Sequence, residues 1–157
     1  MTEPYEVVLA LHSLTRWLVL AMACVAEALA LHGWWARRAF GVRDRRVARS
    51  WVALTDLQIS LGLTLYFAAS PVARLARADL AAAWTSPVLR FFGVLHPSLA
   101  ACAAIAAHAA WLGARRAPSS AVSHRRIALG AAAMLALLAC AIPWPGGVPP
   151  RPLLRLP

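Results

Sequence analysis

The sequence predicts an all-α membrane protein, an up-down four-helix transmembrane bundle with both chain ends outside the cytoplasm. Three observations predict this fold. The chain of 157 residues is 61% hydrophobic and 14% charged, against about 45–50% apolar and about 25% charged in soluble domains. Four apolar runs are long enough to cross a bilayer core of about 30 Å, which takes roughly 20 helical residues. Arginines gather in two stretches between these runs, the pattern of cytoplasmic loops.

Each apolar run is expected to form one helix, and the four helices make a single domain covering residues 1–157. The runs lie at about residues 7–31, 51–69, 88–111 and 127–143. The first lacks a basic leader and is far longer than the apolar region of a signal peptide, so we expect it to stay in the mature protein. Pro97 falls inside the third run, where it predicts a kink because proline cannot complete the helical hydrogen-bond ladder.

The basic residues set the expected orientation. Sixteen basic against six acidic side chains give a net charge of +10, which in a soluble protein would suggest nucleic acid. Because the arginines cluster between apolar runs, we expect a lipid bilayer as the partner and no nucleic acid. The clusters are Arg37, Arg38, Arg43, Arg45, Arg46 and Arg49, and Arg115, Arg116, Arg125 and Arg126. The positive-inside rule places both clusters in the cytoplasm and both termini outside.

Two further features mark the membrane boundaries. Tryptophans lie close to the expected helix ends, where their amphipathic rings suit the headgroup layer. They are Trp34, Trp35, Trp51, Trp84, Trp111 and Trp144. Residues 70–87, between the second and third runs, are expected to include a short amphipathic helix on the outer surface.

Ionisable side chains inside the apolar runs are the candidates for function, because each is costly in a bilayer unless it is paired or solvated. They are His12, Arg16, Glu27, Asp56, His96 and His108. At about 100° per residue, His12, Arg16 and Glu27 fall within roughly 60° of one another on the first helix. This stripe is expected to face protein and not lipid.

The second and third helices each carry one distinctive face. Thr55, Gln58, Gly62 and Tyr66 share a face of the second helix, for which hydrogen-bonded helix packing is the expected role. On the third helix, His96 stands above a strip of alanines at positions 100, 103 and 107. Two interpretations of this strip are open. Another helix packs closely against the small side chains, or a flat cofactor lies in the groove with His96 as axial ligand.

His12 and His96 are expected to lie at the same depth. The first and third helices run in the same direction, and each histidine follows the outer boundary by roughly five to eight residues, about 8–12 Å of helical rise. Two imidazoles at one depth could clamp one haem iron, so both are predicted metal ligands. Arg16, one turn below His12, needs an anion, which a haem propionate, Asp56 or a lipid phosphate would supply. Arg90 would meet either propionates or lipid headgroups.

A second polar group is expected in the inner half of the bundle. Glu27 and His108 come out at similar depth, with Asp56 somewhat nearer the midplane. A cluster of acids and histidine could be an ion-paired structural network, a proton path or a weak metal site. A second haem between His32 and His108 is not expected, because their depths differ by about 12 Å in straight helices.

Four motifs occur in an order that is more specific than any one of them. They are His12-Ser13-Leu14-Thr15-Arg16-Trp17, Leu57-Gln58 to Gly62-Leu63 with Tyr66-Phe67, Arg90-Phe91 to His96-Pro97, and Ile142-Pro143-Trp144-Pro145. From His12 to Pro145 the chain resembles a family of short bacterial four-helix membrane proteins usually labelled cytochrome b.

This resemblance implies a b-type haem held by histidines, a part in membrane electron transfer and a place in the bacterial inner membrane. His12 and His96 match the motif histidines of the family. Its polar positions are matched by Arg16, Gln58 and Arg90. Asp56 stands where many relatives carry histidine, which argues against a second haem near the cytoplasmic face.

The sequence therefore predicts a membrane-bound cytochrome with one haem b, passing single electrons, for example between quinol in the membrane and an outer-face redox partner. Two alternatives stay open. One is a cofactor-free structural or assembly subunit of a larger membrane complex, and the other is a small transporter using Glu27, Asp56 and His108, which would need to be a homodimer.

Most classes of enzyme lack support in the sequence. Nucleophile motifs, Gly-rich phosphate loops, thiolate clusters and catalytic carboxylate pairs are absent from it, which argues against hydrolase, kinase or nucleotide-dependent activity. We expect an electron-transfer protein or redox subunit and not a stand-alone catalyst. The oligomeric state stays open, a homo-oligomer included.

Overall fold

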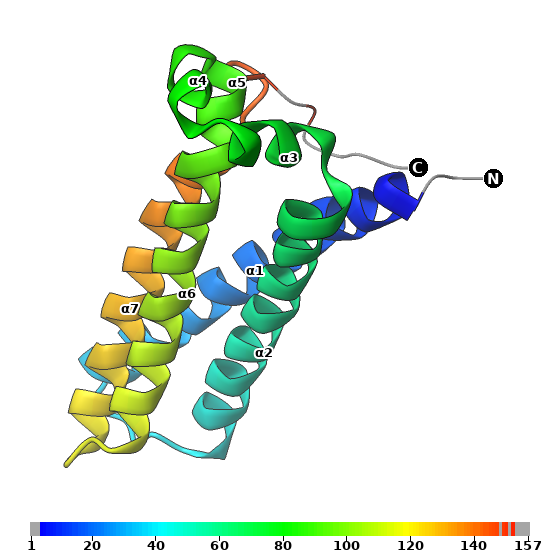
Figure 1. The fold of residues 1–157 in the computed structure, drawn as a ribbon. Helices are drawn as coiled ribbons and strands as arrows, with labels where there is room; N and C mark the ends of the chain where they lie inside the picture. The colour runs from blue at the N-terminus through cyan, green and yellow to red at the C-terminus, as the bar shows by residue number, and fades with distance from the viewer. Residues whose placement is uncertain (1–3, 148, 151, 153–157) are drawn as a thin grey trace.

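The computed structural model describes residues 4–147, 149–150 and 152 and forms a bundle of long helices (Figure 1). The first span is α1 (Pro4–Trp35), the second is α2 (Val42–Thr64) continued by the π-helical turn η1 (Leu65–Ala69), and the fourth is α7 (Ser120–Ala141). The third consists of α5 (Pro87–Arg90), the π-helical turn η2 (Phe91–Leu95) and α6 (His96–Arg115). Two short helices, α3 (Pro71–Ala78) and α4 (Leu80–Thr85), connect the second span to the third.

The four spans are long and apolar enough to cross a bilayer. They contain 32, 28, 29 and 22 residues, against roughly 20 for a membrane-spanning helix. At most 33% of the residues in the most apolar window of each span are buried inside the bundle. Most of the apolar surface therefore faces outward, where lipid would bury it. The prediction of an all-α, multi-pass membrane protein is confirmed.

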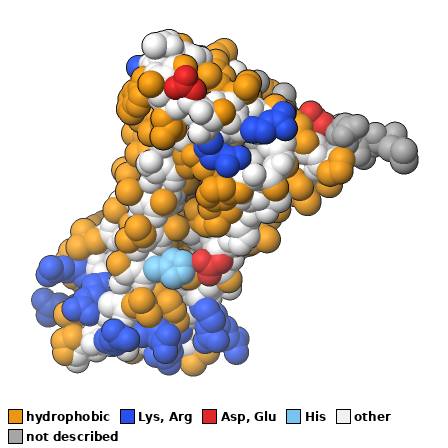
Figure 2. Space-filling model, viewed as in Figure 1, with side chains coloured by type: hydrophobic (Ala, Val, Ile, Leu, Met, Phe, Trp, Pro, Cys, Tyr) orange, Lys and Arg blue, Asp and Glu red, His pale blue; other side chains and the backbone are white. Residues whose placement is uncertain are grey.

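Both arginine clusters lie at one end of the bundle, which we call the arginine-rich end, where α1 meets α2 and α6 meets α7 (Figures 1 and 2). Two helices begin earlier than predicted there, α2 at Val42 instead of residue 51 and α7 at Ser120 instead of residue 127. These predicted boundaries are wrong because hydropathy marks where a helix leaves lipid and not where the helix itself ends. Several of the arginines consequently lie on helices and not in loops.

The start of α2 is fixed by Asp44, which satisfies groups that a helix start leaves unpaired. Its carboxylate accepts hydrogen bonds from the Gly41 N–H at 2.9 Å and from the Arg38 guanidinium at 2.6 and 2.9 Å. The hydrogen bond to Asp44 raises the pKa of the Arg38 guanidinium above its ordinary value. Asp44 is 5% exposed, so this acid is both buried and paired.

Trp51 and His124 fill the core near the arginine-rich end. Trp51 is 0% exposed, and its Nε1–H donates to the Met134 sulfur at 3.1 Å. Trp51 therefore lies in the core of the bundle, where its face of α2 packs against α7. His124 is also 0% exposed, lies 3.2 Å from the Arg38 carbonyl through Nε2, and packs edge-on against Phe40.

The alanine strip of α6 is filled by helix packing. Ala103 and Ala107 are 1% and 0% exposed, because the core of the bundle packs against them. Farther along α6, the backbone of α7 comes so close that a Cβ added at Gly130 would overlap the Ala110 side chain. Small side chains allow helices to approach in this way. Ala103, Ala107 and Ala110 therefore show the close packing that was one of the two interpretations of the strip.

Two short helices close the opposite end of the bundle and confirm the expected helical structure in residues 70–87 (Figure 1). Ser70 and Asp79 cap them by accepting hydrogen bonds from the N–H groups of Ala73 and Ala82. α3 packs closely against the third span, because a Cβ added at Gly93 would overlap the buried Ala76. This contact places α3 directly over the segment that leads into His96.

Candidate functional site

His12 of α1 and His96 at the start of α6 meet inside the bundle. Their ring centroids are 6.2 Å apart, and their planes are inclined by 72°. The two histidines are more than 80 residues apart in the chain, and their rings come together as the depth argument predicted. Two imidazoles that bind one metal from opposite sides, each through a nitrogen about 2 Å away, have centroids roughly 6 Å apart. The observed spacing fits such a pair.

The end of α7 orients the His96 ring. Nδ1 of His96 lies 2.8 Å from the carbonyl oxygen of Ala141, the last residue of α7. A helix leaves its last carbonyls without intrahelical donors, and Pro143 and Pro145 have no N–H to offer. The ring therefore donates its Nδ1–H to this carbonyl, which makes Nε2 the nitrogen with a free lone pair. Metal-binding histidines are commonly held in this way.

Gln58 of α2 holds the His12 ring. The amide nitrogen of Gln58 lies 3.2 and 3.3 Å from the two ring nitrogens and donates to the His12 carbonyl at 3.1 Å. The amide oxygen accepts a hydrogen bond from Thr15 Oγ1. Gly62 provides the room, since a Cβ there would stand 3.3 Å from the ring. The predicted polar face of the second helix thus packs on the predicted polar stripe of the first.

A change in helical geometry sets the position of His96. Pro97 has no N–H to give to the carbonyl of Gly93, four residues earlier. The hydroxyl of Tyr66 donates to that carbonyl instead, at 3.0 Å, and the His96 N–H reaches back five residues to the Phe91 carbonyl. Such π-helical turns often occur at functional sites. The sequence analysis missed this role of Tyr66, for which the unpaired carbonyl before Pro97 was the available signal.

Arg16 and Arg90, the two arginines predicted as site residues, differ in their position relative to the histidine pair. Arg16 is half-buried one turn from His12, close enough to act electrostatically on both imidazoles, and its guanidinium lies 5.2 Å from the Trp17 ring. Arg90 is exposed on α5 and makes no side-chain hydrogen bond within the described part of the chain. His12, His96, Gln58 and Arg16 therefore form one group, and Arg90 stands outside it.

The expected inner cluster forms only in part. Nε2 of His108 lies 3.1 Å from an Asp56 oxygen, with both side chains about half exposed on the surface of the bundle. Glu27 lies beside Ala132 of α7 instead, and one of its buried oxygens has no partner among the described residues. In this described part, no three His, Cys, Asp or Glu side chains group to hold a metal ion. Depth and face can be computed along one helix, but they do not determine which neighbouring helix a side chain meets, and Glu27 meets α7.

Comparisons with family models, curated proteins and solved structures find no match to this chain. The resemblance of the motifs to a family therefore stays an expectation, and the geometry of the histidine pair carries the proposed function.

Proposed function

We propose that the protein is a membrane-bound b-type cytochrome that transfers single electrons, with one haem held between His12 and His96. The approach of the two imidazoles to 6.2 Å carries the proposal. The hydrogen bond from His96 to Ala141 supports it, because it leaves Nε2 as the nitrogen that can bind iron. The haem would supply a one-electron ferric–ferrous couple.

Each neighbouring side chain has a part in this proposal. Gln58 holds the His12 ring against α2 through contacts with both ring nitrogens, so one of these contacts would give way to iron when His12 binds it. The rings of Phe91 and Phe92, 5.9 and 6.1 Å from the His96 ring, exclude water from it. Arg16 offers a positive charge to a propionate. Ligation by two histidines leaves no axial position for substrate, which suits electron transfer.

The proposed orientation follows from the arginines. By the positive-inside rule, the arginine-rich end faces the cytoplasm of a bacterial inner membrane, and both termini lie outside. The histidine pair then lies near the outer surface. Quinol in the membrane would be a suitable electron donor, with a redox partner at the outer face as acceptor.

An optical spectrum of purified protein from haem-replete cells tests the proposal. We expect a Soret band and a sharp α band on reduction, with roughly one haem per chain. His12→Ala and His96→Ala should each remove most of the α band, because one imidazole cannot keep the iron six-coordinate. His108→Ala is the matched control and should leave the spectrum unchanged, since His108 pairs with Asp56 elsewhere. Colourless protein, or bands that survive both site substitutions, would contradict the proposal.

A second candidate is a cofactor-free structural subunit of a membrane complex. The contacts of His12 favour it, because Gln58 and Thr15 already complete a hydrogen-bond network between α1 and α2. The two rings also lie within the range of direct edge-to-face packing. This candidate predicts colourless protein whose stability falls when Gln58 is replaced by leucine.

A further inference from the structure

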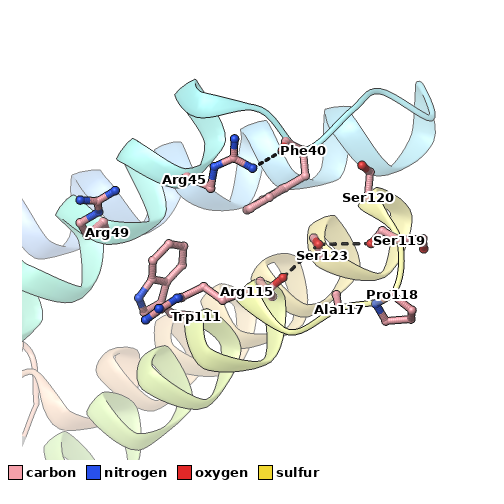
Figure 3. Close-up of a pocket in the computed structure, with 11 residues that line it drawn as sticks. Phe40, Arg45, Arg49, Trp111, Arg115, Ala117, Pro118, Ser119, Ser120 and Ser123 are labelled. Atoms are coloured by element: carbon pink, nitrogen blue, oxygen red, sulfur yellow. Dashed lines mark hydrogen bonds between the residues drawn. The ribbon is translucent and has the colours of Figure 1, made fainter.

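A cavity lies at the arginine-rich end of the bundle, in the half opposite the histidine pair. Its volume is about 740 Å³, and it opens between the first turns of α2 and the connection from α6 to α7 (Figure 3). Side chains from α2, α6 and α7 and from the connecting segments line it, so it is a cleft with walls and not a flat charged surface. Its lining includes Phe40, Arg45, Arg49, Trp111, Arg115 and Ser120.

Three arginines give this cavity its charge. Arg45 and Arg49 stand one turn apart on α2, and Arg115 reaches across from the end of α6 (Figure 3). Arg45 donates one hydrogen bond to the Phe40 carbonyl at 2.9 Å, which fixes its direction and leaves its other donors available. Arg49 and Arg115 make no hydrogen bond or ion pair within the part of the chain that the structure describes.

No acid balances these charges inside the cavity. Among the described residues that line it, none is acidic. The nearby Asp44 is buried and already paired with Arg38 at 2.6 Å. Three guanidinium groups around one cleft repel one another unless an anion lies between them. The cavity is thus complementary to a compact group of high negative charge.

The remaining lining resembles that of a headgroup site. The guanidinium of Arg115 lies 5.5 Å from the Trp111 ring, a cation–π contact that holds it in place. Trp111, Phe40 and Pro118 supply apolar walls, and Ser120 supplies a hydroxyl. Because Trp111 ends the apolar part of the third span, the cleft lies at the level where lipid phosphates are found.

We propose that this cavity binds a phosphate group through Arg45, Arg49 and Arg115. Guanidinium forks pair with phosphate oxygens in two-point contacts. The phosphate belongs either to an anionic lipid headgroup or to a soluble phosphate compound, since the chemistry of recognition is the same. The inference is independent of haem binding.

The test measures binding to protein purified in an uncharged detergent. One arm titrates phosphatidylglycerol and, separately, zwitterionic phosphatidylcholine, and counts bound lipid by native mass spectrometry. The other arm titrates inorganic phosphate by calorimetry. We expect saturable binding in one arm, with phosphatidylglycerol preferred to phosphatidylcholine if the lipid is the source. Binding of inorganic phosphate alone would identify a soluble ligand.

Two triple variants make the test specific, because each removes three positive charges from the same end of the bundle. The site variant carries Arg45→Gln, Arg49→Gln and Arg115→Gln, and the control carries Arg43→Gln, Arg46→Gln and Arg116→Gln. All six side chains are exposed, so both variants should fold, which circular dichroism and gel filtration would check. The site variant should lose roughly 100-fold in affinity and the control no more than about threefold.

Two results would overturn the proposal. One is the absence of saturable binding in both arms. The other is an equal loss of affinity in the two triple variants, which would show attraction by general charge alone. If the site triple variant fails to fold, the single variant Arg49→Gln replaces it, with Arg46→Gln as its control. A loss of affinity in Arg49→Gln alone would support the proposal, and an equal loss in both single variants would overturn it.

Discussion

At the scale of single residues, His96 and His124 differ in the groups that contact their imidazole rings. His96 donates Nδ1–H to the last carbonyl of α7, which directs Nε2 toward a possible metal. His124 is buried with the Arg38 carbonyl at one nitrogen and lies against Phe40, so it has a structural role. Sequence position already separated the two, because His96 lies inside the third apolar run and His124 precedes the fourth. Their difference comes from partners on other helices.

Gly33 tests the structural role of His124. A Cβ at this position would overlap the His124 imidazole, and neither the ring nor the helix backbone of α1 can yield without loss of packing. Gly33→Ala should therefore destabilise the protein by about 1–3 kcal/mol, measured as chemical unfolding in detergent. Gly146→Ala is the control, because nothing lies within 4 Å of its added Cβ. Equal stability of the two variants would contradict the packing described here.

At the scale of helices, hydropathy predicted the number of spans but not their ends. The apolar runs showed four spans because length and composition alone determine whether a helix can cross a bilayer. The ends depend on individual capping groups such as Asp44 and Ser119, which lie outside the apolar runs. The π-helical turn before His96 was missed in detail, although Pro97 signalled a break there.

At the scale of helices, the Tyr66 hydroxyl replaces the backbone N–H that Pro97 lacks as the donor to the Gly93 carbonyl. This replacement can be tested by substitution. Tyr66→Phe removes the hydroxyl that serves the Gly93 carbonyl and should cost about 1–3 kcal/mol, the penalty of an unpaired buried acceptor. Pro97→Ala would restore a backbone N–H four residues beyond this carbonyl. In that background Tyr66→Phe should cost less, by roughly 1 kcal/mol.

A double-mutant cycle measures this coupling from the unfolding free energies of the four proteins. Additive effects of the two substitutions would show that Tyr66 does not replace the donor lost at Pro97.

At the scale of the whole molecule, charge and polarity divide the bundle into two ends. The arginine-rich end carries the cavity proposed to bind phosphate, and the other half carries the histidine pair beneath α3. Face and depth can be computed for a straight helix, and they predicted that His12 and His96 would lie together with Arg16 one turn away. The family resemblance added Gln58, which contacts His12, and Arg90, which lies exposed on α5. The sequence could not predict the cavity, which exists only where separate elements meet.

The proposed orientation gives a prediction for reporter fusions. Alkaline phosphatase, which is active only outside the cytoplasm, should be active when fused after Pro157. The matched fusion after Ala117, in the connection between α6 and α7, should be inactive, because the arginine clusters keep this connection in the cytoplasm. The reverse pattern of activities would contradict the orientation.

The central claim is that two imidazoles hold one iron, and electron paramagnetic resonance of the oxidised, purified protein tests it most directly. Ligation by two histidines predicts a low-spin ferric signal, and ring planes inclined by 72° predict the strongly anisotropic form of that signal. His12→Ala and His96→Ala should each abolish it, while His108→Ala should not. No low-spin signal from protein made in haem-replete cells, or a signal that survives both site substitutions, would contradict the claim.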